Sequence, residues 1–410
     1  MKHIWKTILV SCLMFGHAAS AEESNSLLAC EEPTEFLSPM RYLRALTFDL
    51  AGRAPDENEI STVSSAGEVP EALIDALLAD RQFAEQAARF HRSFLWNNLS
   101  TVRLVNANFR LQRASGQLHW RRNPARIYRG DNIPCLDQPA QFDQNGNIMP
   151  ISGTQEGYVL VQPYWLPEGE TIKVCAYDAQ TQVESSSGVV CNTRGGANQA
   201  SCGCGPNLRW CSLGGSGERA ITDAMSESME QFILSVFERN EPYSTLFDSR
   251  RAFINGPLSF FYRNWLDIAA GIAYRPLAIN PEQTPQLDFL NEEWVEYTLP
   301  ETHAGLLTHP AFLLRFQTNR ARANRFYDAF LCNGFQAPDS GLPVADDGNA
   351  LNPNLQERTG CEYCHARLEP AAAHWGRWTE QGIGFLDEDR FPATREDCLR
   401  CALTNQGCSA

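Results

Sequence analysis

EALIDALLADRQFAEQAARFHRSFLW, residues 71–96, sets the fold class that we expect for this chain. Five of its residues recur at three- and four-residue spacing: Leu73, Leu77, Ala84, Ala88 and His91. This spacing places them on one face of a helix. The helical pattern covers the region from Ser38 to about Leu99, with a turn at AGRAPDENE (51–59). The first part of the chain is therefore predicted to be helical.

A second helical region is expected after LGGSGE (213–218), a glycine-rich stretch that we interpret as a hinge-like linker. One apolar stripe follows it, made of Met225, Met229, Phe232, Ile233 and Val236. A stripe with this spacing packs into a core, so its methionines are expected to be core residues rather than ligands. We expect helices to continue to Cys332.

The region from about Asp131 to Gly217 has a different composition. GYVLVQPYWL, ETIKVCAYDA and SGVVC are short runs of β-branched and aromatic residues separated by Pro, Gly and Ser, which is typical of strands. Six cysteines lie here: Cys135, Cys175, Cys191, Cys202, Cys204 and Cys211. The set is even and allows about fifteen pairings, among which the sequence does not choose. We predict that these cysteines bond among themselves.

The expected fold is mainly α, with a multi-helical body, a small disulfide-rich β insert and a C-terminal C-x-x-C-H segment. We predict these boundaries: signal peptide 1–21, N-terminal helical domain 22–130, cysteine-rich β insert 131–217, helical domain 218–335, tether 336–354 and motif segment 355–410. The tether is polar and rich in Pro, Gly and Asp. It cannot hold the terminal segment to the body by itself.

The first residues predict export. MKHIWKTILVSCLMFGHAASAEE has a basic start, a short apolar run and a small-x-small ending at Ala19-Ser20-Ala21, as in a cleaved secretory signal. Leu9-Val10-Ser11-Cys12 also looks like a lipoprotein box, but few apolar residues precede Cys12. We therefore expect cleavage after Ala21 and a periplasmic or secreted protein. Thirteen of the fourteen cysteines follow the signal, more than a reduced cytosolic protein usually carries.

The acidic net charge of the chain bears on which kinds of molecule it can bind. Loss of Lys2 and Lys6 with the signal would take the formal net charge from −15 to −17. An acidic chain repels nucleic acid, so no nucleic-acid partner is expected. No later stretch is long and apolar enough to predict a transmembrane segment.

The motif that bears on function lies in ERTGCEYCHARLEP, residues 357–370. Cys361, Cys364 and His365 have the spacing C-x-x-C-H and would share one face of a helical turn. Such a turn can bind one covalent haem c through two thioethers and an iron-ligating imidazole. Two other interpretations stay open: a disulfide, or a zinc site with Cys398 and Cys401. An oxidising compartment disfavours the all-thiolate zinc site.

Two further stretches carry a family resemblance. HAGLLTHPAFL (303–313) precedes the C-x-x-C-H motif, and RALTFDLAGRAPDENE (44–59) lies near the start of the chain. With ERNEPYSTLFDSRRAFINGPLSFFY (238–262), they resemble planctomycete- and myxobacterial-type cytochrome c-like secreted proteins of uncharacterised domains. The matching residues are Arg44, Leu46, Thr47, Asp49, Leu50, Gly52, Pro55, Glu59, Gly305, Leu306, Leu307, Thr308, Phe312, Leu313, Cys361, Cys364, His365 and Pro370. The resemblance implies a mainly helical protein with a c-type haem segment that acts in electron transfer.

The chain departs from that pattern near the motif. The family's Asp-Pro is Glu369-Pro370 here, and Ala372-Ala373 replaces a Gly-Phe pair. No methionine occurs after Met229, so the sixth iron ligand of many small cytochromes is absent. Candidates for this position are His374 and His309, and beyond these His303 and Met149. If none binds, the iron would be five-coordinate and open to a small ligand.

Three functions follow from these observations. The first is an exported mono-haem c-type protein that transfers electrons to an unknown redox partner, with His365 as axial ligand. The second is a cofactor-free, disulfide-stabilised exported binding or assembly protein whose β insert presents a partner surface. The third is haem-dependent enzyme chemistry, but no G-x-S-x-G, H-E-x-x-H or phosphate-binding loop names a reaction.

The sequence offers two ways to fix the terminal segment to the body. One is a disulfide from Cys332 or Cys30 to Cys398, Cys401 or Cys408. The other is burial of Trp375, Trp378 and Phe385 against the helices that follow Leu306. Each buried aromatic stabilises by roughly 1.5–3 kcal/mol, so two or three would dock the segment without a bridge.

Overall fold

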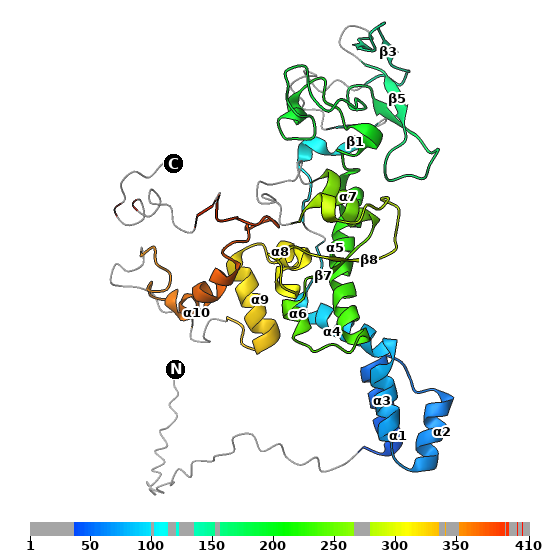
Figure 1. Cartoon of the computed structure of the whole chain (residues 1–410), viewed down its shortest axis with the longest axis vertical. Helices are drawn as coiled ribbons and strands as arrows, with labels where there is room; N and C mark the ends of the chain where they lie inside the picture. The colour runs from blue at the N-terminus through cyan, green and yellow to red at the C-terminus, as the bar shows by residue number, and fades with distance from the viewer. Residues whose placement is uncertain are drawn as a thin grey trace, which may run out of the picture.

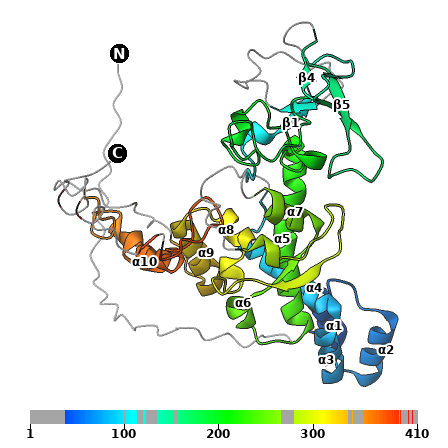
Figure 2. The same ribbon diagram turned by 45° about the horizontal axis from the view of Figure 1, so that its top comes forward.

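The computed structural model describes residues 37–99, 102–113, 120–122, 135–151, 156–265, 279–335, 341, 352–389, 391–392, 400 and 404. The molecule is elongated, with the first helices at one end and the cysteine-rich insert at the other (Figure 1). A helical body lies between them, and the C-terminal motif segment packs against its side (Figures 1 and 2). The predicted signal peptide, residues 1–21, lies outside the described residues.

The N-terminal region is helical, as its periodicity predicts. Its elements are α1 (Pro39–Leu46), η1 (Thr47–Ala51), α2 (Glu57–Ala66), α3 (Glu71–Ala79) and α4 (Arg81–Leu95). A capping box begins α2, because Asp56 accepts from Glu59 N at 2.8 Å while the Glu59 side chain accepts from Asp56 N at 2.7 Å. Asp80 is both the C-cap residue of α3 and the N-cap residue of α4, where its side chain accepts a hydrogen bond from Gln82 N at 2.7 Å.

Helix α4 packs against α5 (Gly214–Glu238), the long helix of the body (Figure 1). On the predicted face of α3 and α4, Leu77, Ala84, Ala88 and His91 are buried, and Leu73 is half-buried. The predicted stripe of α5 is buried along its whole length, from Met225 to Val236. Both predictions of core faces are confirmed.

The glycine-rich stretch at 213–218 is not a hinge. It forms the first turn of α5, so the interpretation as a linker is wrong. Glu218 explains the difference, because its buried carboxylate accepts from Leu104 N at 2.9 Å and pairs with Arg110 at 2.6 Å. These contacts hold the helix start against a distant part of the chain, and they outweigh the weak helix propensity of glycine.

The rest of the body combines short helices with one small sheet. Its elements are α6 (Thr245–Asp248), β7 (Arg251–Ile254), α7 (Gly256–Asn264), η8 (Pro281–Gln283), β8 (Val295–Thr298), η9 (Leu306–Thr308), α8 (Pro310–Arg315) and α9 (Asn319–Leu331). Strands β7 and β8 are antiparallel, with Arg251 opposite Thr298. Gly305 has φ +54°, and a Cβ there would lie 2.1 Å from Leu246 O, so this turn requires glycine.

The insert is built on a four-stranded sheet in the order β1-β2-β6-β5. Its strands are β1 (Leu111–Arg113), β2 (Trp120–Arg122), β5 (Tyr158–Val161) and β6 (Ile172–Cys175), and a separate hairpin joins β3 (Gln141–Phe142) to β4 (Ile148–Met149). β2 and β6 are parallel, whereas the outer pairs are antiparallel. Two strands of this sheet come from before residue 131, where the insert was expected to begin.

Three disulfides tie the insert: Cys135–Cys175, Cys191–Cys202 and Cys204–Cys211. All six cysteines are buried. The prediction that these cysteines bond among themselves is confirmed.

A buried ion pair adds to the disulfides. Arg122 Nε donates to Asp178 Oδ1 at 2.8 Å, and both side chains are fully buried. Arg122 also donates to Cys202 O at 2.5 Å, so it joins the end of β2 to the second disulfide loop. The sequence did not predict this ion pair, because its two residues are 56 positions apart and come together only in the folded chain.

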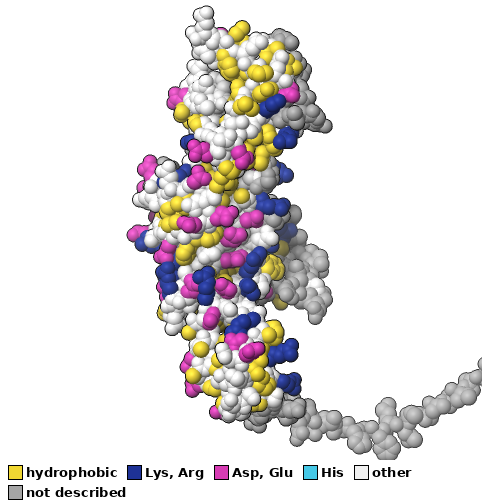
Figure 3. Space-filling view, turned by 90° about the vertical axis from the view of Figure 1, so that its right-hand side faces the viewer, with side chains coloured by type: hydrophobic (Ala, Val, Ile, Leu, Met, Phe, Trp, Pro, Cys, Tyr) yellow, Lys and Arg dark blue, Asp and Glu magenta, His cyan; other side chains and the backbone are white. Residues whose placement is uncertain are grey.

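The expected fold class holds in part. A disulfide-rich insert and a many-helix body are present, but strands also occur in the body and before residue 131, so the protein is not clearly mainly α. Acidic and basic side chains are interspersed on the face shown in Figure 3. No helix in the described part of the chain is long and apolar enough to cross a membrane.

Candidate functional site

The C-x-x-C-H motif begins helix α10 (Glu362–Ala372). Cys361 is the N-cap residue and already has helical φ and ψ. Its carbonyl accepts from Cys364 N at 3.2 Å and from His365 N at 3.0 Å, which closes one helical turn around the motif. The predicted turn is confirmed. The amino end of α10 points away from the helical body in Figures 1 and 2.

Both motif thiols are free. Cys361 and Cys364 are half-buried, and neither is bonded to the other or to another described cysteine. The tyrosine between them, Tyr363, is 52% exposed. In the described part of the chain, no group of three or more His, Cys, Asp or Glu residues is arranged to hold a metal ion. The other half of the predicted zinc site, Cys398 and Cys401, lies outside the described residues.

The imidazole of His365 is held by a carboxylate on its own helix. Glu369 lies one turn further along α10, and its Oε1 accepts from His365 Nδ1 at 2.7 Å. Arg320 Nε of α9 donates to the same oxygen at 2.6 Å. Burial would raise the pKa of Glu369, but the hydrogen bonds from Arg320 and His365 bring that pKa below its ordinary value. Glu369 is therefore an anion at neutral pH.

These residues fit a covalently bound haem. Two free thiols lie one turn apart, and the adjacent imidazole donates through Nδ1, which leaves the Nε2 lone pair for a metal. No hydrogen bond to Nε2 occurs among the described residues. A carboxylate that fixes the remote nitrogen of a ligating histidine is a common feature of metal sites, because it sets the tautomer and the ring orientation. A chance C-x-x-C-H need not have this partner.

His309 lies in the core of the body rather than beside the motif. Its Nδ1 accepts from Ala311 N at 3.2 Å, so Nε2 carries the hydrogen and faces Ser228 Oγ at 3.4 Å. Burial, with a contribution from His303, lowers the pKa of His309 to about 3. As an iron ligand, His309 would have to leave both partners and the core.

The other candidates for the sixth position are scattered. His303 is buried, donates from Nδ1 to Thr308 O at 3.1 Å and contacts the Trp378 ring edge-on. Met149 belongs to β4 in the insert, which forms one end of the molecule, whereas α10 lies at the side of the body (Figures 1 and 2). His374 is exposed on η11 (Ala373–Trp375). His374 is nine positions after His365, and at about 100° per residue this offset puts the two side chains on opposite sides of a continuous helical path.

Aromatic packing docks the terminal segment. Trp375 and Trp378 are buried, and Trp375 Nε1 donates to Leu307 O at 2.8 Å. The Trp375 ring stacks on Phe312 with centroids 6.2 Å apart, and Phe385 packs edge-on against Trp378. The predicted burial is confirmed for Trp375 and Trp378, whereas Phe385 is half-buried. The alternative disulfide stays a prediction, because Cys30, Cys398, Cys401 and Cys408 lie outside the described residues.

Arg322 of α9 is a second docking device that the sequence analysis missed. This fully buried guanidinium donates to Leu313 O at 3.1 Å in the body and to Thr379 O at 2.9 Å in the terminal segment. Burial lowers the pKa of Arg322 to about 10, against the attraction of Glu380. An arginine run such as RFQTNRARANR (315–325) is typical of a solvated helix face, but Arg322 and Arg325 are buried here.

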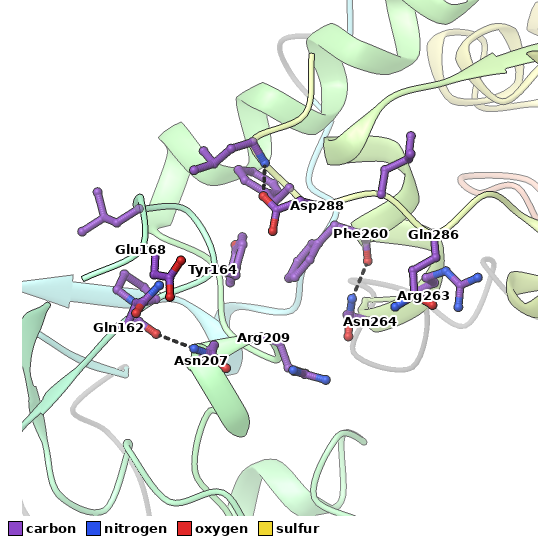
Figure 4. Close-up of a pocket in the computed structure, with 15 residues that line it drawn as sticks. Gln162, Tyr164, Glu168, Asn207, Arg209, Phe260, Arg263, Asn264, Gln286 and Asp288 are labelled. Atoms are coloured by element: carbon purple, nitrogen blue, oxygen red, sulfur yellow. Dashed lines mark hydrogen bonds between the residues drawn. The ribbon is translucent and has the colours of Figure 1, made fainter. Parts of the chain in front are cut away.

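A separate groove lies where the insert meets the body. Its volume is about 1120 Å³. In Figure 4 the rings of Tyr164 from the insert and Phe260 from α7 face one another, and Arg209 and Asn264 lie beneath them. The ring centroids are 3.9 Å apart. Amide, guanidinium and carboxylate side chains complete the wall: Gln162, Asn207, Arg263, Gln286, Glu168 and Asp288.

The loop at the base of this groove is cross-linked and has a strained backbone. Asn207 and Leu208 both have positive φ, at 52° and 58°, in the loop that the Cys204–Cys211 disulfide closes. Asn207 O accepts from Tyr164 N at 2.9 Å, and Asn207 Nδ2 donates to Gln162 O at 3.0 Å. Backbone strain that persists in a well-held loop is often found at binding sites.

Compared with known proteins, the chain matches no protein-family model, no curated protein and no solved structure. The described geometry is therefore the basis for the function proposed below.

Proposed function

We propose that this chain is an exported mono-haem c-type protein that transfers electrons one at a time. Cys361 and Cys364 would hold the haem by thioether bonds, and His365 would be an axial iron ligand. One observation carries the proposal: a single helical turn presents two free thiols and an imidazole whose Nδ1 is already bound by Glu369. The disulfide interpretation does not account for this carboxylate, and the zinc site with Cys398 and Cys401 would use four thiolates rather than His365.

The disulfides of the insert support export. Disulfides persist in oxidising compartments such as the bacterial periplasm. Haem c is assembled in that compartment in bacteria, so the three bridges and the motif are consistent with one location. The half-buried thiols of Cys361 and Cys364 are free in the same chain, which is what covalent attachment requires.

The residues of α10 would each have a defined role. A bound haem supplies an iron that changes its oxidation state by one electron. His365 would bind it through Nε2, while Glu369 holds the imidazole in the tautomer that leaves Nε2 unprotonated. Because the amino end of α10 points away from the body, a redox partner can approach the attachment site (Figures 1 and 2).

We propose that neither His309 nor His374 is the sixth ligand of the haem iron. His309 is bound in the core, and His374 lies on the far side of the helical path from His365. We expect a high-spin ferric spectrum that neither His309→Gln nor His374→Ala changes. Conversion of a low-spin to a high-spin spectrum by His374→Ala alone would identify His374 as the sixth ligand.

Export from a host with haem c maturation tests the proposal. The purified protein should show a haem spectrum that survives acid-acetone extraction, because thioether bonds are covalent. The double variant Cys361→Ser, Cys364→Ser should be colourless. Cys332→Ser is the matched control, since Cys332 is an exposed free cysteine outside the motif, and it should keep the full spectrum.

A colourless wild-type protein, obtained folded while a known c-type cytochrome matures in the same host, would overturn the proposal. Loss of colour in Cys332→Ser as well would show that the variants fail for reasons unrelated to the motif.

The groove between insert and body favours a second function, that of an exported binding protein. Its mixed wall of aromatic rings, amides and balanced charges suits a neutral polar ligand such as an oligosaccharide. Thermal-shift measurements with a panel of neutral oligosaccharides test this function. Arg209→Ala and Gln286→Ala, both exposed on the wall, should abolish any shift without loss of stability. A shift that persists in both variants would place the binding elsewhere.

A further inference from the structure

One carboxylate oxygen links the terminal segment to the body. Glu369 Oε1 lies 2.7 Å from His365 Nδ1 and 2.6 Å from Arg320 Nε. His365 and Glu369 belong to α10, whereas Arg320 belongs to the first turn of α9. A single oxygen therefore receives a hydrogen bond from the proposed iron ligand and one from a cation of another helix.

The contact with Arg320 depends on docking. Helices α9 and α10 pack against one another, and the buried residues Leu368, Ala372 and Trp375 hold the interface beside Glu369. The His365–Glu369 contact spans one turn of a single helix, so it needs no docking. The Arg320–Glu369 contact joins residues 49 positions apart, and it exists only while the segment lies against α9.

The two hydrogen bonds have opposite effects on the imidazole. A carboxylate that accepts from Nδ1–H makes the histidine a more basic ligand. A more basic ligand stabilises ferric over ferrous iron, and this lowers the reduction potential. A guanidinium on the same oxygen withdraws electron density and competes for its lone pairs. Arg320 therefore weakens the action of Glu369 on His365.

We propose that Glu369 and Arg320 are positioning residues that set the reduction potential of the haem, and that docking of α10 against α9 raises this potential by bringing Arg320 to Glu369. The inference rests on the proposed haem site. It adds a coupling between the body and the redox centre: undocking the segment would make the iron harder to reduce.

Four variants of the full-length haem protein test this coupling. Glu369→Gln keeps the shape of the side chain but weakens the acceptor. It should raise the ferrous-to-ferric ratio at a fixed potential about tenfold, or ~59 mV for a one-electron couple. Arg320→Gln should lower the same ratio about threefold, because the half-exposed ion pair is a modest interaction. Midpoint potentials from spectroelectrochemical titration give both values.

The double variant Glu369→Gln, Arg320→Gln separates contact from long-range charge. If Arg320 acts through Glu369, its replacement should have little effect once Glu369 is Gln. Arg367→Gln is the charge control, because Arg367 lies on α10 two residues from His365 and contacts Phe335 rather than Glu369. The Fe–His stretching frequency in resonance Raman spectra should fall in Glu369→Gln and rise in Arg320→Gln.

Each outcome has one meaning. Equal shifts for Arg320→Gln and Arg367→Gln in both backgrounds would show that only distant charge matters, and the proposed coupling would be wrong. Unchanged potentials and Raman frequencies in fully haem-loaded variants would reject the inference but leave the haem site intact. Absence of covalent haem from the wild-type protein would instead overturn the proposed function.

Discussion

Two regions of this chain use cysteine in opposite ways. In the insert, six fully buried cysteines form three disulfides with Cα–Cα distances of 5.7, 5.0 and 5.2 Å. In the terminal segment, Cys361 and Cys364 stay free and half-buried at the start of a helix that points away from the body. Buried sulfur holds a region with short strands together. The half-buried thiols of Cys361 and Cys364 are free to react, as the proposed covalent cofactor requires.

The largest stability effect should come from the ion pair in the insert. Arg122→Ala leaves the Asp178 carboxylate buried without its cation, and we expect a loss of about 3–5 kcal/mol in the free energy of unfolding. Arg320→Ala removes the half-exposed partner of Glu369 and should cost only ~0.2–1 kcal/mol. Urea unfolding followed by circular dichroism compares the two. Similar losses in the two variants would mean that the burial of Arg122 does not determine how much its ion pair contributes to the free energy of unfolding.

The disulfides of the insert should contribute strongly to the stability of the fold, whereas the thiols of the C-x-x-C-H motif should contribute little. Cys135→Ser with Cys175→Ser opens a bridge across a sequence separation of 40 residues. By loop entropy this should cost about 4 kcal/mol. Cys361→Ser with Cys364→Ser, in protein made without haem maturation, should change stability by less than about 0.5 kcal/mol. A large loss from the second pair would show that the motif thiols are structural, against the proposed cofactor.

The terminal segment should be held by its aromatic anchor. Trp375→Ala removes a buried ring and its hydrogen bond to Leu307 O, at a cost of about 3 kcal/mol. After proteolytic cleavage within 336–354, the two pieces of the wild-type protein should stay associated in native buffer, whereas those of Trp375→Ala should separate on gel filtration. His374→Ala, an exposed neighbour, is the control. Separation of the wild-type pieces would mean that the segment is an independent tethered carrier.

The core beneath the terminal segment should make stability depend on pH. Burial lowers the pKa of His309 to about 3, so the folded state stays neutral there while the unfolded state takes up a proton below about pH 6.5. Stability should therefore be flat above that pH and fall as the pH decreases, by up to about 2 kcal/mol at pH 5 from His309 alone. His309→Gln should flatten this slope in urea unfolding at several pH values. His374→Gln should not, and an unchanged slope in His309→Gln would assign it to other groups such as His91.

The sequence by itself determined the features that depend on neighbours along the chain. Three- and four-residue spacing predicted the buried faces of α4 and α5, and the C-x-x-C-H spacing predicted one helical turn. The even, clustered cysteines predicted a module closed by its own disulfides. The i, i+4 spacing of His365 and Glu369 was also readable, although we noted Glu369 only as a departure from a family pattern.

Only the tertiary structure decided what depends on residues far apart. Glu218 turned a glycine-rich stretch into the start of α5 because its partners lie more than a hundred positions earlier. The short polar strands β1 and β2 lack the alternation of apolar and polar residues that would predict a strand. They form because β2 pairs with the edge of β6 and β1 pairs with β2. Arg122 with Asp178, and Arg320 with Glu369, are close only after folding. Local periodicity depends on neighbouring residues and can be read from the sequence. The partner of a buried charge or of a short strand comes from a distant segment, so it is determined only when the chain has folded.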